Sequence, residues 1–268
     1  MKAYFKQNTL PFWIFHLACL GVFIVPFHWS YVALALGLYA VRMFFVTAGY
    51  HRYFSHRAFA TSRFFQFLLA FGAMTTSQKG VLWWAAHHRE HHRHSDREAD
   101  IHTPNKGFLW SHMGWILSDQ HSETDLSRIA DFAKYPELVW LNCHWYVPVT
   151  LYGATLLALG GWSAIIWGLC VSTVILWHGT FTINSLSHVW GYKRYETGDR
   201  SANNPVLAII TLGEGWHNNH HQFPSASRNG FYWYEYDFTF YGLKVLSWFG
   251  LVWDLRPVPK KAYLLKGA

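Results

Sequence analysis

The chain has 268 residues, of which 51% are hydrophobic, 19% aromatic and only 14% charged, and its formal net charge is +7. So much apolar surface with so little charge excludes an ordinary soluble domain, and it excludes the nucleic-acid partner that a basic chain would otherwise suggest. The composition instead predicts an integral membrane protein.

Four apolar stretches approach the roughly 20 residues that a helix needs to cross a bilayer. They span about residues 12–27, 31–50, 140–160 and 162–181. Only "HWS" separates the first two stretches and only "GGW" separates the last two, so each pair predicts a helical hairpin. The first stretch is expected to be an uncleaved anchor rather than a signal peptide, because a second apolar stretch follows at once.

Nearly all lysines and arginines lie outside these two short connections. Because positively charged segments stay on the cytoplasmic side, both termini and the segments 51–139 and 188–268 are expected there. The prediction is an all-α, multi-pass protein of the bacterial cell membrane. Its four transmembrane helices form two hairpins, and its two cytoplasmic segments form one helical cap, so that residues 1–268 make a single domain.

Two other apolar segments do not fit a crossing. Residues 64–76 are too few to span a bilayer, and residues 232–255 are interrupted by charges, so both are predicted to lie at the membrane surface. Arg42 lies inside the second stretch, where its charge is expected to reach back to the cytoplasmic surface. The three cysteines lack any paired spacing and are expected to be reduced packing residues.

The sequence "HREHH" at residues 88–92 returns as "HNNHH" at residues 217–221. In a helix, positions i, i+3 and i+4 share one face, so each segment presents its imidazoles together. "HRYFSH" contributes two more histidines five residues apart, a spacing that favours a helix end, and "NSLSH" ends in another. These nine histidines are His51, His56, His88, His91, His92, His188, His217, His220 and His221.

Nine clustered imidazoles predict metal binding, because neutral ring nitrogens are direct metal ligands. Nine exceed the four ligands of a single zinc site, so at least two ions are expected. Soluble di-iron proteins use Glu-x-x-His twice, and only Glu214 and His217 match that spacing here. The site is therefore expected to be rich in histidine rather than bridged by carboxylates. Of the other histidines, four are assigned to local hydrogen bonds and five to the cap, where they could support the ligands: His16, His28, His144 and His178, and His87, His94, His102, His112 and His121.

"HRYFSH", "HREHH", "NSLSH" and "GEGWHNNHH", in this order and flanked by paired apolar stretches, resemble the integral-membrane fatty acyl desaturases, most closely the group that includes stearoyl-CoA desaturase. The likeness covers nearly the whole chain and extends to "GFLWSHMGWIL". It implies a non-haem centre of two iron ions that uses O2 and two external electrons. The product would be a cis double bond, typically at the delta-9 position, in a saturated acyl chain.

The resemblance also implies roles for individual residues. The nine histidines above match the family's iron ligands, and Asn184 matches a residue that reaches one iron through water. Five further residues match positions that shape the acyl tunnel. Gln78, Trp84 and Thr180 would form its bend, and Tyr39 and Met43 its far end.

The same resemblance bears on substrate carrier and electron donor. Acyl-CoA is the first expectation, but Ala86, His87 and Lys79 depart from the family's CoA-facing residues, which leaves a phospholipid or an acyl-carrier-protein thioester open. A separate ferredoxin or cytochrome b5-like protein would supply electrons. Basic residues of the cap would attract such a donor or face anionic membrane lipids. They are Lys193, Arg194, Arg200 and Arg228.

Two other functions are compatible with a histidine-rich membrane protein. A hydroxylase would use the same di-iron site and return a hydroxyl group instead of removing a second hydrogen. A metal transporter would place ionisable ligands along a path near the middle of the membrane, whereas these histidines flank the apolar stretches.

Overall fold

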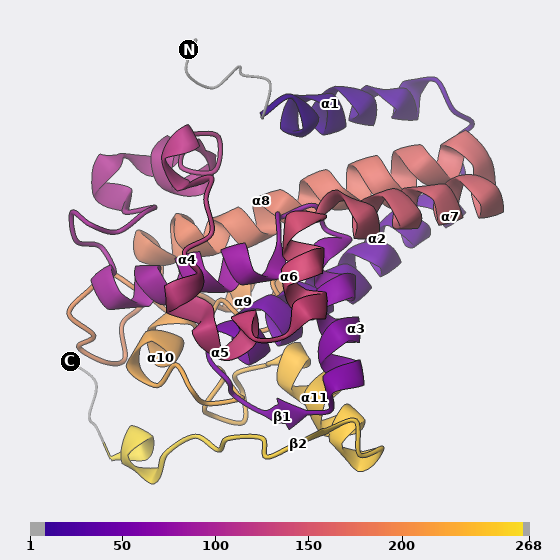
Figure 1. The fold of residues 1–268 in the computed structure, drawn as a ribbon. Helices are drawn as coiled ribbons and strands as arrows, with labels where there is room; N and C mark the ends of the chain where they lie inside the picture. Colours follow the sequence, from indigo (N-terminus) through magenta and orange to yellow (C-terminus); the bar gives the residue numbers. More distant parts are fainter. Residues whose placement is uncertain (1–8, 265–268) are drawn as a thin grey trace.

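The computed structural model describes residues 9–264. The expected placement of the two chain ends therefore lies outside the described residues. The described chain is mostly helical (Figure 1) and holds one antiparallel pair of two-residue strands, β1 (Ala60–Thr61) and β2 (Val252–Trp253). The main helices are α1 (Leu10–Ala18), α2 (Trp29–Phe44), α3 (Arg63–Met74), α4 (Val81–His94), α5 (Ala130–Ala133), α6 (Pro136–Cys143), α7 (Tyr146–Ala164), α8 (Ser172–Asn184), α9 (Pro205–Ile210), α10 (His217–Gln222) and α11 (Phe238–Trp248).

Within residues 9–264, two continuous helical runs are long and apolar enough to cross a membrane, Trp29–Ser55 and Tyr146–His188. The second run contains Gly161 at φ 61°, a conformation that glycine adopts without a steric penalty. The chain reverses there, so α7 packs against the π-helix η9 (Ile165–Val171), which leads into α8. The hairpin predicted from "GGW" is therefore present, although its first arm begins at Tyr146 rather than near residue 140.

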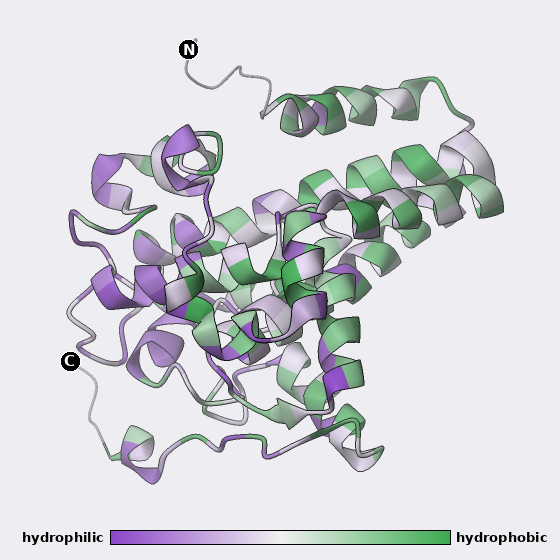
Figure 2. Ribbon diagram, viewed as in Figure 1, coloured by the Kyte–Doolittle hydropathy of each residue, from purple (hydrophilic) through white to green (hydrophobic). Residues whose placement is uncertain are grey.

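The first apolar stretch forms α1 and a short 3₁₀ helix that ends at Phe23, shorter than the predicted 12–27. This segment packs against η9 and α8. Figure 2 shows that α1, α2, α7 and the first part of α8 are largely hydrophobic, whereas hydrophilic residues gather at the other end of the molecule, around α10 and the end of α4. The structure thus has a hydrophobic end and a hydrophilic end.

The second apolar stretch runs further than predicted, because α2 continues as the π-helix η4 (Phe45–Ser55). In η4 the His56 amide donates to the His51 carbonyl across five residues, at 3.3 Å. The π-helix closes its turns with this i→i+5 spacing, so the two histidines of "HRYFSH" point to the same side. The sequence predicted a helix end here. The wider turn of the π-helix, which ends at Ser55, brings the rings of His51 and His56 together.

Arg42 does not reach the surface as predicted. Its side chain is only 3% exposed and lies between α2, α3 and α8. The guanidinium donates to the Thr75 carbonyl at 2.8 Å and to the hydroxyls of Thr173 and Ser172 at 2.7 and 3.2 Å. It also lies over the Tyr152 ring at 4.7 Å. Local oxygens thus bind both terminal nitrogens of the guanidinium inside the helix bundle.

The two segments predicted at the membrane surface form α3 and α11. Ser62 caps α3, its Oγ accepting from the Phe65 amide at 3.2 Å, and the helix packs its other end against η4. The segment around α11 exposes a dense set of aromatic side chains to the outside. They are Trp233, Tyr234, Tyr236, Phe238, Tyr241, Trp248, Phe249 and Trp253.

Candidate metal centre

The nine histidines predicted as ligands lie together in two groups. The first histidine group is His51, His56, His88, His92 and His220. The second histidine group is His91, His188, His217 and His221. Within each group, the candidate ligand atoms all lie within 4.8 Å of one another, so each group could hold one ion.

Helices α4 and α10 both contribute to both groups, which explains the repeated motif. On α4, His88 and His92 are four residues apart and join the first group, while His91 turns to the second. On α10 the assignment is reversed: His217 and His221 join the second group and His220 the first. Each helix therefore presents an i, i+4 pair to one group and a single ring to the other.

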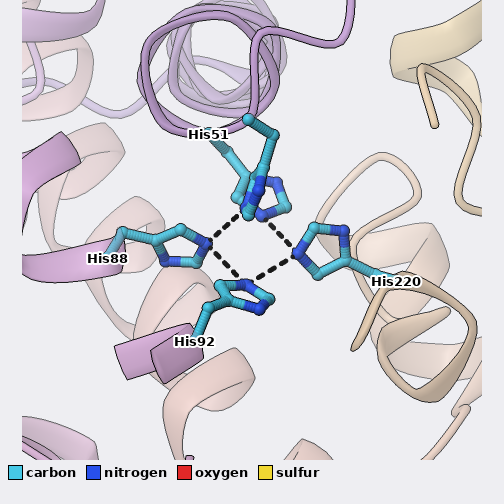
Figure 3. A group of neighbouring side chains, drawn as sticks. His51, His88, His92 and His220 are labelled. Atoms are coloured by element: carbon cyan, nitrogen blue, oxygen red, sulfur yellow. Dashed lines mark hydrogen bonds between the residues drawn. The ribbon is translucent and has the colours of Figure 1, made fainter. Parts of the chain in front are cut away.

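The contacts within the first group fit a shared cation better than hydrogen bonds. The Nε2 atoms of His88, His92 and His220 each lie 2.9–3.1 Å from two other Nε2 atoms, and Figure 3 shows the labelled rings pointing toward a common centre. A ring nitrogen carries either one proton or one lone pair, so it cannot form two good hydrogen bonds in different directions. A metal ion at the centre would accept all these lone pairs at once.

The spacing also indicates the coordination geometry. Nitrogens that each lie about 2.1 Å from one ion are about 3.0 Å apart at neighbouring corners of an octahedron and about 3.4 Å apart in a tetrahedron. The His51–His220 and His92–His220 Nε2 pairs are both 3.0 Å apart. Five nitrogens at this spacing would give one ion more than four ligands, which disfavours a closed tetrahedral zinc site.

The second group carries unpartnered ring nitrogens. The Nε2 atoms of His91 and His221 are buried and have no hydrogen-bond partner among the described residues. The Nε2 atoms of His188 and His217 are 3.0 Å apart. Buried polar atoms without a partner are costly, and coordination of an ion would satisfy all four.

Four carboxylates fix the orientation of the rings from outside. The Nδ1 atoms of His91, His188 and His221 lie 3.1, 3.0 and 2.6 Å from carboxylate oxygens, and that of His51 lies 2.6 Å from one. With Nδ1 held by an acceptor, Nε2 is left free to bind metal. The partners are Asp100, Asp96, Asp199 and Glu214, in the same order. No sequence pattern predicted a role for the three aspartates, which stand in loops without a repeated spacing, and the spacing of Glu214 suggested only a ligand.

Electrostatic effects favour the neutral form of several rings and the charged form of the carboxylates. Burial, reinforced by neighbouring imidazoles, lowers the pKa values of His88, His92 and His220 well below their usual range. Burial alone would raise the pKa of Glu214, but Arg52 and His51 outweigh it and lower that pKa to about 2. Arg52 is itself fully buried and also pairs with Asp237 at 2.9 Å.

A cavity borders the first histidine group. Its lining includes His88 together with Gln78, Trp84, Thr180 and Asn184, so four of the six predicted tunnel and support residues meet there. Gln78 Nε2 donates to Thr180 Oγ1, and Trp84 Nε1 donates to Gln78 Oε1, both at 3.4 Å. The remaining walls are largely aromatic and aliphatic. They include Phe12, Trp83, Trp115, Ile116, Leu117, Trp145, Trp177 and Phe181.

The other two predicted tunnel residues do not line this cavity. Tyr39 and Met43 lie on α2 against Gly179, where an added Cβ would meet the Tyr39 hydroxyl at 2.9 Å and the Met43 methyl at 3.2 Å. Gly179 precedes Thr180, so the pair lies beside the cavity wall rather than inside the cavity.

The other nine histidines belong to neither group. His16, His178 and His112 form a chain of ring contacts at 3.1 and 2.9 Å, and His144 bonds to its own helix, which agrees with local hydrogen bonding. His102 packs beside His91, with ring centroids 4.2 Å apart.

Comparison with known proteins identifies the class of this fold and site. The sequence profile of the fatty acid desaturases matches residues 26–246. The chain is 38% identical over 257 residues to an sn-1 stearoyl-lipid 9-desaturase of Anabaena variabilis, covering 95% of this chain and 94% of the relative. It is 36% identical over 268 residues to the sn-1 stearoyl-lipid 9-desaturase of Synechocystis sp., covering 96% and 84%. An acyl-CoA 5-desaturase of Anemone leveillei is 35% identical over 255 residues, covering 94% and 79%.

The chain belongs to the fatty acid desaturase family. It is therefore an oxidoreductase that desaturates acyl chains, as the motifs predicted. The apolar helices fit a membrane-associated enzyme, and the two histidine groups fit a metal site.

Proposed function

We propose that this protein is a delta-9 desaturase of acyl chains esterified to membrane glycerolipids, with an iron ion in each histidine group. The observation that carries the proposal is a largely apolar cavity whose lining includes His88, a member of the first histidine group. The cyanobacterial relatives named above, which align over nearly the whole chain, are 9-desaturases of lipid-linked stearoyl chains.

The balance of electrons and protons in desaturation defines what the site must receive from outside the chain. A saturated chain gives up two hydrogen atoms when its C=C bond forms, and these supply two electrons and two protons. Reduction of O2 to two waters takes four of each, so two electrons and two protons come from outside. Bound iron would supply the O2-derived oxidant that removes hydrogen from an unactivated carbon.

The residues of the chain would orient the metal ligands and form the walls around the substrate. The outer carboxylates hold Nδ1 of His51, His91, His188 and His221, which leaves the Nε2 atom of each of these rings free to ligate. A saturated hydrocarbon offers no hydrogen-bonding group, so the choice of carbon pair depends on the shape of an apolar slot. The Gln78–Thr180 and Gln78–Trp84 contacts place a fixed polar point in the cavity wall at which the slot would bend.

The surroundings of Trp83 support a lipid carrier over acyl-CoA. Ala86 is 1% exposed and offers no charge to a nucleotide. Burial lowers the pKa of His87 to about 4, so its ring is neutral, and its Nδ1 is engaged with the Trp83 carbonyl at 2.8 Å. Lys79 lies over the Trp83 ring, 4.5 Å from the ring centroid, rather than beside an arginine that could help it hold a phosphate.

The apolar helices support a membrane arrangement of four crossings in two hairpins, α1 with α2–η4, and α7 with η9–α8. Both histidine groups then lie on one side, where most charged segments also lie, and the positive-inside rule makes that side cytoplasmic. A bacterial cell membrane is the proposed location, with lipids around α3 and the aromatic face of α11.

Lipid analysis after expression in a desaturase-deficient bacterium tests the proposal. The expected product is a delta-9 monounsaturated chain that appears first in intact glycerolipids. Purified protein should hold two irons per chain, the number of histidine groups. Label that appears first in acyl-CoA would reject the lipid carrier, and hydroxylated chains without new double bonds would instead identify a hydroxylase. Variable zinc uptake without oxygen-dependent turnover would favour a transporter.

A further inference from the structure

A polar pocket opens on the surface of the molecule beside the strand pair. It is lined by the end of η4 and the turn after it, by β1, α3 and α5, and by the chain after β2. Its buried lining residues form the floor, and they include Tyr53, Phe59, Gln66 and Phe132. Its exposed lining residues form the rim, and they are Arg57, Asp254 and Arg256. Among the residues that the structure describes, this pocket and the cavity beside His88 share no lining residue, so the two are separate.

Gln66 gives the floor of the pocket a hydrogen-bond donor without a partner. The residue is only 2% exposed. Its Oε1 accepts from the Tyr53 hydroxyl at 2.9 Å, which fixes the orientation of the amide. Its Nε2 is buried and has no hydrogen-bond partner within residues 9–264. An amide nitrogen carries two N–H groups, and buried donors without an acceptor are costly. The floor therefore favours a ligand that offers oxygen atoms.

Guanidinium groups outnumber carboxylates around the pocket. Arg57 Nε lies 2.7 Å from Asp131 Oδ2, but Arg89 also holds both oxygens of Asp131, at 2.8 and 2.9 Å. One carboxylate thus serves two arginines. The side chain of Arg256 forms no ion pair with any described residue, and neither does the remaining carboxylate, Asp254. The excess of positive charge and of N–H donors favours an anion with several oxygens, such as a phosphate group.

Exposed apolar side chains flank the pocket on two sides. Helix α3, which carries Gln66 on its buried side, exposes Phe64 and Leu68 by 72% and 37%. Across the pocket, Ala60 pairs with Trp253, which is 44% exposed. Figure 1 shows α3, α11 and the strand pair on the same side of the molecule. These side chains would contact the acyl chains of a lipid whose phosphate lies in the pocket, whereas a free phosphate would leave them in water.

We propose that this pocket binds the phosphate group of an anionic membrane phospholipid, with Gln66 at the floor and Arg57 and Arg256 at the rim. The amide and the two guanidinium groups would donate to the phosphate oxygens. This lipid is not the acyl substrate, because the pocket is separate from the cavity that borders the first histidine group. The site therefore goes beyond the proposed function and does not depend on it.

The pocket is connected to the helices that carry the first histidine group. Arg89 stands on α4 and donates to the carbonyls of Phe54 and Ser55, at the end of η4, at 2.8 and 3.0 Å. Asp131 joins Arg89 to Arg57. A lipid bound at Arg57 would thus stabilise the contact between α4 and η4. Because a ligand that binds only the folded chain raises its stability, the bound lipid should also raise Tm.

Substitutions in the pocket are tested with matched controls. Gln66→Glu keeps an acceptor for the Tyr53 hydroxyl but removes the free N–H donors, and Arg256→Gln removes an exposed rim charge. The controls Gln120→Glu and Arg97→Gln make the same changes at exposed positions outside both cavities. Native mass spectrometry of the full, detergent-solubilised chain counts bound phosphatidylglycerol. Each pocket variant is expected to bind one phosphatidylglycerol per chain at least about tenfold more weakly, and the controls to match the parent protein.

A third variant is expected to change binding in the opposite direction. Asp254→Asn removes the one rim carboxylate that has no ion pair in the described part of the chain, and asparagine tolerates the φ of 51° at this position. Binding of phosphatidylglycerol should become severalfold tighter. A substitution that only disturbed the fold would not strengthen binding, so this variant separates recognition of the phosphate from a loss of structure. Unchanged or weaker binding in Asp254→Asn would count against the site.

The choice of probe distinguishes the possible ligands. Tm of the parent protein is measured with phosphatidylglycerol, phosphatidylcholine, diacylglycerol and inorganic phosphate. Phosphatidylglycerol should raise Tm the most, and this gain should shrink in Gln66→Glu and Arg256→Gln. An equal gain with diacylglycerol would overturn phosphate recognition, and an equal gain with phosphatidylcholine would overturn the preference for an anionic lipid. An equal gain with inorganic phosphate alone would identify a free anion instead of a lipid. Equal lipid binding by the parent protein and both pocket variants would overturn the site itself.

Discussion

At the scale of single residues, the histidines and their outer partners differ in how visible they are in the sequence. The ligand candidates stand out because helical spacing repeats them, as in His88 and His92 or His217 and His221. Asp96, Asp100 and Asp199 show no such repeated spacing in the sequence. They stand in loops that come close to the histidine rings only in the folded chain. Spacing therefore predicts which rings share a helix face, and tertiary contacts decide what orients them.

Loss of the carboxylate on His51 should weaken metal binding without removing a ligand. In Glu214→Gln, the amide cannot accept from both Arg52 and His51 as the carboxylate does, and Arg52 loses half of its buried charge compensation. We expect iron affinity to fall about 10- to 100-fold, measured by competition with a chelator. The control Glu137→Gln alters an ion pair with the largely exposed Arg63 and should leave affinity unchanged.

Removal of one ring should affect the second group first. His91→Ala deletes a buried ligand candidate whose Nε2 has no hydrogen-bond partner in the described part of the chain. Iron content, measured by plasma mass spectrometry, should fall from two per chain to one or fewer, and double-bond formation should be lost. His94→Ala changes a histidine on the same helix that contacts Glu90 instead, and it should retain both irons and activity. Full iron content in His91→Ala would contradict the assignment of this group.

At the scale of elements, the sequence predicted helices well and their exact form poorly. "HRYFSH" predicted a helix end, and the helix does end there, at Ser55. The sequence did not predict that this last part is a π-helix, because hydrophobic patterns do not reveal an i→i+5 turn. The hairpin at Gly161 follows from a short glycine-containing connection. The boundaries of the apolar helices were misplaced by several residues because apolar side chains continue past each helix end or stop before it.

Helix α2 is the element expected to limit acyl chain length. Met43 packs against Gly179, next to the cavity residue Thr180, and is 1% exposed. Met43→Ala should open space beside the cavity and shift products toward longer chains, at a cost of about 2–5 kcal/mol in stability. Gas chromatography of products from a mixed-length substrate pool measures the shift. Met74→Ala, equally buried and not part of the cavity lining, should lose stability alone.

At the scale of the whole molecule, the metal site joins segments that are far apart in the chain. Each histidine group draws rings from at least three segments, among them η4, α4, the 3₁₀ helix η10 (Leu186–His188) and α10. The sequence predicted this convergence only by resemblance and by the rule that positive segments share one side. Arg42 shows the limit of such rules. Its guanidinium donates to oxygens of Thr75, just after α3, and Thr173 on α8, and the sequence around Arg42 does not reveal these partners.

Metal should therefore stabilise the fold as a whole. An ion that binds only the folded chain raises stability by mass action, and here it would also relieve unpartnered nitrogens in the second group. We expect removal of iron by a chelator to lower Tm by several degrees, and added Fe2+ to restore it. The shift should be smaller in His91→Ala. Equal melting curves with and without iron would contradict a role for the centre in holding the segments together.

The crossed use of α4 and α10 has a consequence for how the centre fills. Each of these two helices contributes a pair of rings to one histidine group and a single ring to the other. An ion bound in the first histidine group would fix the relative orientation of both helices. Three of the four rings of the second group lie on these helices, so they would already be in position for a second ion. Iron uptake should consequently be cooperative, and chains carrying a single ion should be scarce during loading.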